Sequence, residues 1–319
     1  MFHFIELEEK QLRQLSDAQA AWRNLLQARK DAGEVRGSMK WKTVDGRTYL
    51  VRVSPRGAET SLGPQDERTQ AIYEGFHARK GPAEARLKAM KATLDEHRRL
   101  NRAFRVGRTP AVVVRSLAAI DDAGLSDQFL TVGTHALYAY ETAAGVRVEP
   151  GAVATQDLDL LFEAGKLRTY TSRMARSDAR SLIAVLRKAD PTFRVKRAQL
   201  QTAVNDAGFE IDIIRRRATG ADPHPLRMSD DEDDFWAVQV DQGEKLASSR
   251  RFEHLVVAAN GEMALMRTLH PLDFIRLKQD LAQRPGRDPL KAPKDRLQAQ
   301  VVRQLWDNFL QHVVRPEAS

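Results

Sequence analysis

The sequence predicts an α/β (α+β) fold in which a mixed sheet is flanked by helices, and three observations lead to this prediction. The chain has 319 residues, 42% of them hydrophobic, so it can bury a sizeable core. Apolar residues recur at helical spacing through the first hundred residues. From residue 129 onward, short apolar strands alternate with helical segments, which is typical of an α/β domain.

The first 109 residues are predicted to form a basic helical module with a β-hairpin. Helical spacing predicts one amphipathic helix from Phe4 to about Asp31. A second helical pattern runs from Gln65 to Lys80, is expected to break at Gly81-Pro82 because proline lacks a backbone N–H, and continues to Phe104. Its apolar residues recur at nearly heptad spacing, which indicates packing against other helices. These helices could also join copies of the chain into an oligomer.

A β-hairpin is predicted between these helical segments. Residues 39–44 and 47–53 flank Asp45-Gly46, a dipeptide that suits a type I′ turn because both central residues need positive φ. In that register, one face of the hairpin carries Lys40, Lys42, Arg47 and Tyr49. Cations beside an aromatic ring are typical of nucleic-acid surfaces, although a plain solvated sheet face has the same composition. Nucleic-acid contact by this face is therefore one of two interpretations.

A core domain is predicted over residues 110–260, followed by a C-terminal helical region over residues 261–319. Helices are expected at 110–124, 134–144 and 177–188, and strands at 129–132, 157–162, 193–204, 209–214 and 252–258. Within the C-terminal region, the helical tail is expected to begin at Pro271.

Charge and composition restrict the classes of function. The net charge is +8, and residues 1–110 hold all of this excess, with 22 Lys and Arg against 14 Asp and Glu. A basic module beside a neutral domain indicates a polyanionic partner, although solvated helices can carry the same charge. The absence of cysteine excludes disulfides, thiolate zinc sites and cysteine nucleophiles. Since no signal-like or membrane-spanning apolar run is present, we expect a cytoplasmic protein that has no membrane partner.

Carboxylates at alternate positions of predicted strands form the candidate chemical site. Asp157 and Asp159 point to one face of their strand and can reach one hard cation, whereas burying them without a cation would be costly. A later strand brings Asp212 as a third carboxylate, with Glu210 on the same face as an alternative ligand. Crowded carboxylates repel one another unless a divalent cation such as Mg²⁺ neutralises them.

A glycine at a strand-to-helix junction supplies the context for these acids. Gly133-Thr134 ends the predicted strand at 129–132, where free backbone N–H groups of the following helix would point at an anion. Glycine also allows a phosphate to approach the backbone closely. The adjacent His135 is interpreted as a capping or packing residue rather than a catalytic base.

The order of these motifs resembles the nucleotidyltransferase superfamily that shares the DNA polymerase β fold. Its signature is a small-residue pair at a strand-to-helix turn, then Asp-x-Asp, then a third Asp on a later strand. One departure is Thr134, followed by His135, in place of a second Gly or Ser. Similarity to an uncharacterised bacterial nucleotidyltransferase-fold family extends to residues 133–141, Pro271–Phe274, Lys278, Lys294-Asp295, Gln298-Ala299, Trp41-Lys42 and residues 61–64.

The resemblance implies a nucleotidyltransferase core between the N-terminal helix-hairpin-helix module and the C-terminal helical tail. It implies transfer of a nucleoside monophosphate (NMP) from a nucleoside triphosphate (NTP), dependent on Mg²⁺ or Mn²⁺, with release of pyrophosphate. Asp157 and Asp159 would hold the metal with the NTP, and Asp212 would complete a second metal site and help to activate the acceptor. Gly133 and Thr134 would contact phosphate, and Lys278 would reach the triphosphate by similarity to a helix lysine of related enzymes.

The sequence does not identify the acceptor of the NMP. An RNA 3′ end would suit the basic N-terminal module, while a protein hydroxyl, as in toxin-like members of the superfamily, or a small molecule would leave that charge without a role. The sequence also does not determine whether an antitoxin-like partner controls the protein. The alternative function is a catalytically inactive nucleotidyltransferase-fold module that binds nucleic acid or protein.

Overall fold

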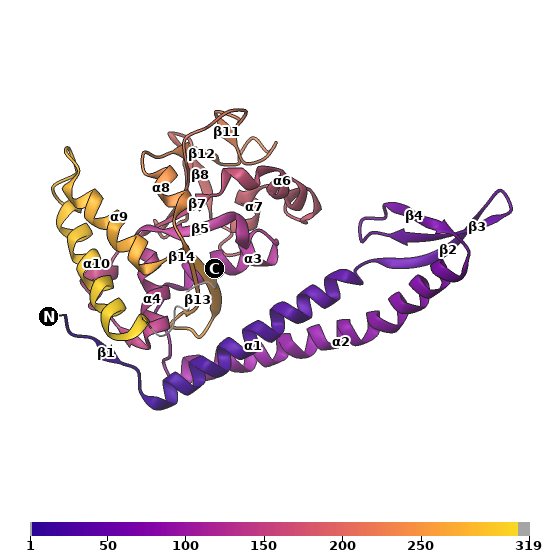
Figure 1. Ribbon diagram of the computed structural model, residues 1–319, viewed down its shortest axis with the longest axis horizontal. Coiled ribbons are helices and arrows are strands. Elements are labelled where there is room, and N and C mark those ends of the chain that lie inside the picture. The colour runs from indigo at the N-terminus through magenta and orange to yellow at the C-terminus, as the bar shows by residue number, and fades with distance from the viewer. Residues whose placement is uncertain (1, 312–319) are drawn as a thin grey trace. The chain divides into compact units, whose positions relative to one another are not determined.

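The computed structural model describes residues 2–311, which fall into two compact units (Figure 1). Residues 13–100 form one unit, and the second unit combines residues 2–12 with residues 101–311. Among the helices of the described part, none has both the length and the apolar character that crossing a membrane requires.

Two long helices and a three-stranded antiparallel sheet build the unit of residues 13–100. The elements are α1 (Glu9–Glu34), β2 (Ser38–Val44), β3 (Arg47–Val53), β4 (Glu59–Pro64) and α2 (Glu67–Ala103). The predicted hairpin is confirmed, because Trp41 pairs with Leu50 and the turn residues Asp45 and Gly46 have φ values of 50° and 76°.

The predicted helix break at Gly81-Pro82 is wrong, since α2 continues through Pro82 as one helix. Proline removes one backbone hydrogen bond, but the apolar contacts on both sides of it hold the helix together. Phe76 belongs to the small buried core beneath the sheet, and Ala83 packs against the same core. Tertiary packing therefore overrides the local signal to end the helix.

A seven-stranded mixed sheet forms the centre of the second unit, which confirms the α/β class. Strand order is β11–β12–β10–β7–β5, with β9 also paired to β10 and β8 paired to β9. The strands are β5 (Phe129–Val132), β7 (Asp157–Phe162), β8 (Arg194–Lys196), β9 (Gln199–Val204), β10 (Glu210–Arg215), β11 (Leu226–Arg227) and β12 (Trp236–Gln239). Strands β7 and β10 run parallel, while β5 is antiparallel to β7.

Helices and two small strand pairs complete this unit (Figure 1). The strand pairs are β1 (Ile5–Glu6) with β6 (Val146–Arg147) and β13 (Arg251–Val257) with β14 (Met263–Leu269). The helices are α3 (Ala111–Asp122), α4 (Ala136–Ala144), α5 (Pro150–Val153), α6 (Leu167–Arg176), α7 (Leu182–Leu186), α8 (Gly243–Ser248), α9 (Pro271–Gln283) and α10 (Lys291–Leu305).

Some element boundaries differ from the sequence prediction. Helix α1 begins at Glu9 rather than Phe4, because Ile5 pairs with Arg147 as a strand. The helix predicted over 177–188 shrinks to α7, because the Ser181 hydroxyl accepts a hydrogen bond from the Ala184 N–H and caps the helix there. The strand predicted over 193–204 is divided into β8 and β9.

Candidate functional site

Four carboxylates gather on one face of the central sheet. In the parallel pairing of β7 and β10, Asp159 lies opposite Asp212 and Asp157 lies opposite Glu210. Directly paired residues of neighbouring strands point to the same face, and so do alternate residues of one strand. The structure therefore brings together the three aspartates named from the sequence, with Glu210 as a fourth carboxylate.

Hydroxyl and ammonium groups hold several of these carboxylates. The Thr155 hydroxyl donates a hydrogen bond to Asp157, and the Thr202 hydroxyl on β9 donates to Asp212. Lys196 on β8 forms an ion pair with Glu210. Glu210 is thus neutralised by a nearby cation, which makes Asp212 the better candidate for the third functional acid on this strand.

Burial and mutual repulsion disfavour the charged forms of two of the aspartates. Burial, together with the charges of Asp157 and Asp212, raises the pKa of Asp159 to about 7, while Lys278 and Lys291 act in the opposite direction. Burial also raises the pKa of Asp212; the Thr202 hydrogen bond lowers it, and the charge of Asp157 raises it further. This face of the sheet therefore carries concentrated negative charge that a bound cation would relieve.

The donor set suits Mg²⁺ or Mn²⁺, because carboxylate oxygens are hard ligands. Over residues 2–311, however, no group of three or more His, Asp or Glu side chains is arranged so that it could hold a metal ion. Two of the carboxylates instead accept hydrogen bonds from the hydroxyl groups of Thr155 and Thr202. The residues fit a metal by the chemistry of their oxygen donors and by sharing one face of the sheet.

Gly133 lies directly against the carboxylate face. Strand β5 ends at Val132, which pairs with Asp159, and Gly133 follows with φ of 71°. A Cβ atom at Gly133 would lie 2.4 Å from Asp159 Oδ2. Both the backbone conformation and the close approach therefore require glycine here.

Replacing Gly133 by alanine is expected to destabilise the fold by more than about 1 kcal/mol and to displace the Asp159 carboxylate. The matched control is Gly208→Ala, because Gly208 has φ of 79° but open space where a Cβ would lie. Thermal melts of the two variants would distinguish the cost of a positive φ, which both share, from the cost of the contact with Asp159, which only Gly133→Ala makes. Equal losses of stability would contradict the importance of the contact with Asp159.

His135 is completely buried beside the carboxylates and packs edge-on against Phe209, with ring centroids 5.9 Å apart. Burial lowers its pKa to about 4, although the charge of Asp157 acts in the opposite direction. The imidazole is therefore neutral near pH 7 and has no exposed surface. This environment suits a packing residue better than a catalytic base.

Lys278 does not extend freely into solvent. Its ammonium group forms a buried ion pair with Asp295 at 2.9 Å, and Arg287 binds the other oxygen of Asp295 at 2.6 Å. Burial lowers the pKa of Lys278 and the pairing with Asp295 raises it, while its charge also lowers the pKa of Asp159. Sequence reasoning noted Asp295 only as part of a motif and missed Arg287, because neither has a local pattern that reveals its partner.

The hairpin face of the other compact unit keeps the predicted arrangement, since Lys42 pairs across the hairpin with Tyr49 and Val44 with Arg47. Lys40 and Lys42 both form ion pairs with Glu59 at 2.7 Å. Two of the three cations expected on this face thus share the single negative charge of Glu59. Nucleic-acid contact by this face stays a prediction.

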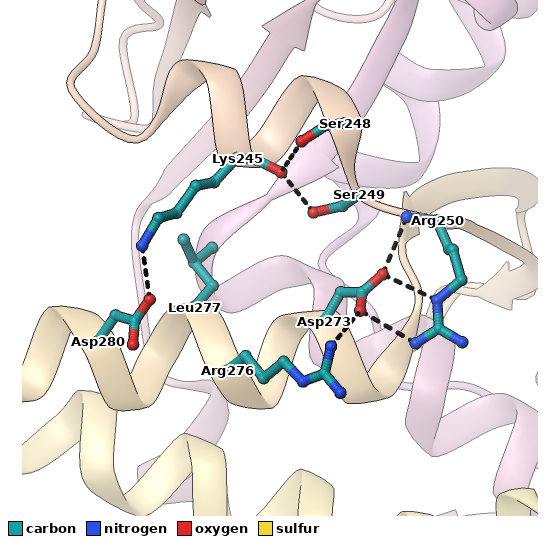
Figure 2. Close-up of a pocket in the computed structure, with 8 residues that line it drawn as sticks. All are labelled: Lys245, Ser248, Ser249, Arg250, Asp273, Arg276, Leu277 and Asp280. Atoms are coloured by element: carbon teal, nitrogen blue, oxygen red, sulfur yellow. Dashed lines mark hydrogen bonds and ion pairs between the residues drawn. The ribbon is translucent and has the colours of Figure 1, made fainter.

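A pocket of about 460 Å³ lies between α8 and α9 (Figure 2). None of the predicted catalytic, metal-binding or nucleotide-binding residues lines it, although Asp273 belongs to the motif at residues 271–274. Its charged side chains pair with one another: Lys245 with Asp280 at 2.8 Å, and Arg250 with Asp273 at 3.0 Å. These internal pairs satisfy the lining of the pocket, so the carboxylate face is the stronger candidate site.

Comparison with known proteins adds one finding. A family model described as nucleotidyltransferase matches residues 111–317, more than half of the chain. The match begins at the first residue of α3 and contains the Gly133 turn, the carboxylates of β7 and β10, and both C-terminal helices. Searches of curated proteins and of solved structures gave no match.

Proposed function

Because the chain belongs to the nucleotidyltransferase family, we propose that it transfers an NMP from an NTP to an acceptor hydroxyl and releases pyrophosphate. The observation that carries this proposal is the shared face of Asp157, Asp159 and Asp212 beside the Gly133 turn. The family match supports nucleotidyl transfer in general, and the carboxylate face supports its dependence on a metal.

Each residue has a distinct proposed role. Asp157 and Asp159 would hold Mg²⁺ or Mn²⁺, which when bound neutralises the triphosphate and the charge that develops during transfer. Asp212, whose pKa burial raises, would take the proton of the acceptor hydroxyl. Gly133 and Thr134 would contact phosphate oxygens at the turn, and Lys278 would add positive charge behind Asp159.

The proposed step balances as an in-line displacement. The acceptor oxygen forms a bond to the α-phosphorus while the bond from that phosphorus to the oxygen bridging the β-phosphate breaks. Pyrophosphate leaves with the electron pair, and the acceptor proton passes to the Asp212 carboxylate. The protein contributes mainly positioning and charge stabilisation, as is usual for phosphoryl transfer.

We favour an RNA 3′ hydroxyl as the acceptor. All of the excess positive charge lies in the first 110 residues. Helix α2 exposes Lys88, Lys91 and Arg99, which could neutralise phosphates along a strand. A protein hydroxyl would give this charge no comparable role, so modified protein is the outcome that would replace RNA as acceptor.

The function can be tested with the full chain and each α-labelled NTP in turn, mixed with total RNA, with protein extract or with small molecules. We expect label at RNA 3′ ends, with a yield that falls steeply as salt rises. The Asp157→Ala/Asp159→Ala variant should lose transfer, whereas Asp230→Ala/Asp233→Ala, which changes two exposed acids of a loop, should retain it. Absence of label from every acceptor, with NTP binding retained, would instead identify a catalytically inactive binding module.

A further inference from the structure

Helix α10 is joined to the Gly133 turn through one buried side chain. Gln298 is completely buried, and its Nε2 donates hydrogen bonds to Thr134 Oγ1 at 3.0 Å and to the Ala152 carbonyl oxygen at 2.9 Å. Thr134 is the residue after Gly133 and is only half-buried. A side chain far along the chain therefore contacts the hydroxyl group of one of the two residues proposed to bind phosphate.

The same face of α10 also contacts the segment that leads into β7. Lys294, one helical turn before Gln298, donates to the Ala154 carbonyl oxygen at 2.6 Å. Residues 152–154 lie just before Asp157. Helix α10 thus contacts both the turn after β5 and the segment before Asp157, the first of the two aspartates proposed to hold a metal.

The contact with Ala152 fixes the direction of the hydrogen bond to Thr134. A carbonyl oxygen can only accept, so the Gln298 atom beside it must be the amide nitrogen. The same nitrogen must then donate to the Thr134 hydroxyl oxygen. A hydroxyl that accepts in this way keeps its own proton for another partner, and over residues 2–311 no protein acceptor takes that proton.

A purely structural role explains Gln298 poorly. Its Oε1 is buried and has no hydrogen-bond partner within the described residues. A buried polar atom without a partner lowers stability, so the hydrogen bonds that Nε2 donates to Ala152 and Thr134 have to offset this cost. The amide is better explained by what it does to Thr134.

We propose that Gln298 is a positioning residue that holds the Thr134 hydroxyl with its proton directed at a phosphate oxygen of the bound triphosphate. This inference rests on the proposed function, since it assigns the donor role within the same site. Gln298 itself does not touch the substrate. It acts through Thr134 by fixing the position of the hydroxyl group and by making this hydroxyl a donor toward the phosphate.

The test is isothermal titration of each MgNTP into wild type, Gln298→Leu, Gln298→Glu, Thr134→Val and the double variant Thr134→Val/Gln298→Leu. Loss of one hydrogen bond to a charged phosphate should weaken binding roughly tenfold in Gln298→Leu and in Thr134→Val. Gln298→Glu should weaken binding further, because its carboxylate would accept the Thr134 proton and turn the hydroxyl lone pairs toward the phosphate. The double variant should bind no more weakly than Thr134→Val alone.

Gln304→Leu is the matched control, because Gln304 also lies on α10 but contacts the Phe2 backbone N–H at 3.0 Å instead of the site. It should bind MgNTP like the wild type, and thermal melts should show Gln298→Leu folded at the titration temperature. Wild-type affinity in Gln298→Leu, or a full additional loss in the double variant, would overturn the inference. A wild type that binds no MgNTP would overturn the proposed function as well, which distinguishes the two failures.

Discussion

The Asp159→Asn variant is expected to lose nucleotidyl transfer by at least about 10²-fold and yet to melt at a higher temperature than the wild type. Burial and the charges of Asp157 and Asp212 raise the pKa of Asp159 to about 7, so its charged form opposes folding in the absence of a cation. Asparagine keeps the shape and removes the charge. The gain in unfolding free energy should be about 2 kcal/mol near pH 7.5, less than the full pKa difference implies because the site is partly solvated.

The pH dependence gives this prediction a definite sign. In the unfolded chain Asp159 loses its proton near its ordinary pKa, whereas in the folded protein it keeps the proton up to about pH 7. The stability of the wild type should therefore fall, relative to Asp159→Asn, as pH rises from about 4 to about 7, and the difference should be constant above that. Melts in chelator across this range are the measurement. A variant that is less stable than the wild type at pH 7.5 would contradict the account of the carboxylate face.

The Asp295→Ala variant is expected to lose about 3–5 kcal/mol of unfolding free energy, the largest loss we expect from one substitution. The Asp295 side chain is only 3% exposed and pairs with both Lys278, which is 8% exposed, and Arg287. Its removal would leave a buried ammonium group without a partner, which costs far more than an exposed ion pair would. Urea unfolding monitored by circular dichroism would measure the loss.

Lys278→Met/Asp295→Leu tests the cause of that loss. Removing the buried ammonium and its partner together leaves mainly apolar groups, so the double variant should recover much of the stability. Arg287 is 26% exposed and can reach water when Asp295 is gone. A double variant as unstable as Asp295→Ala would show that packing, rather than the uncompensated charge, explains the effect.

Much of the carboxylate face could be predicted because its information is local. Alternation along residues 157–162 specifies a strand that points Asp157 and Asp159 to one face, and the strand occupies those residues. The apolar residues before Gly133 end in a turn of positive φ that only glycine adopts easily. These patterns depend on neighbours in sequence, so a single chain reveals them.

The contacts made by the C-terminal helices could not be predicted in the same way. Gln298 and Thr134 are 164 residues apart, and nothing local to either residue specifies the hydrogen bond between them. The continuity of α2 through Pro82 likewise depends on the buried core that Phe76 and Ala83 share. Tertiary packing determines both features. It overrides the local propensity at Pro82, and it creates a contact at Gln298 that no local propensity specifies.

Titration of each MgNTP into the wild type and into Asp157→Ala/Asp159→Ala tests the central claim most directly. We expect saturable binding of at least one MgNTP to the wild type and at least tenfold weaker binding to the double variant, because those two carboxylates would hold the metal with the triphosphate. Equal affinity of the two proteins for every MgNTP would contradict a metal-dependent transferase site on this face of the sheet.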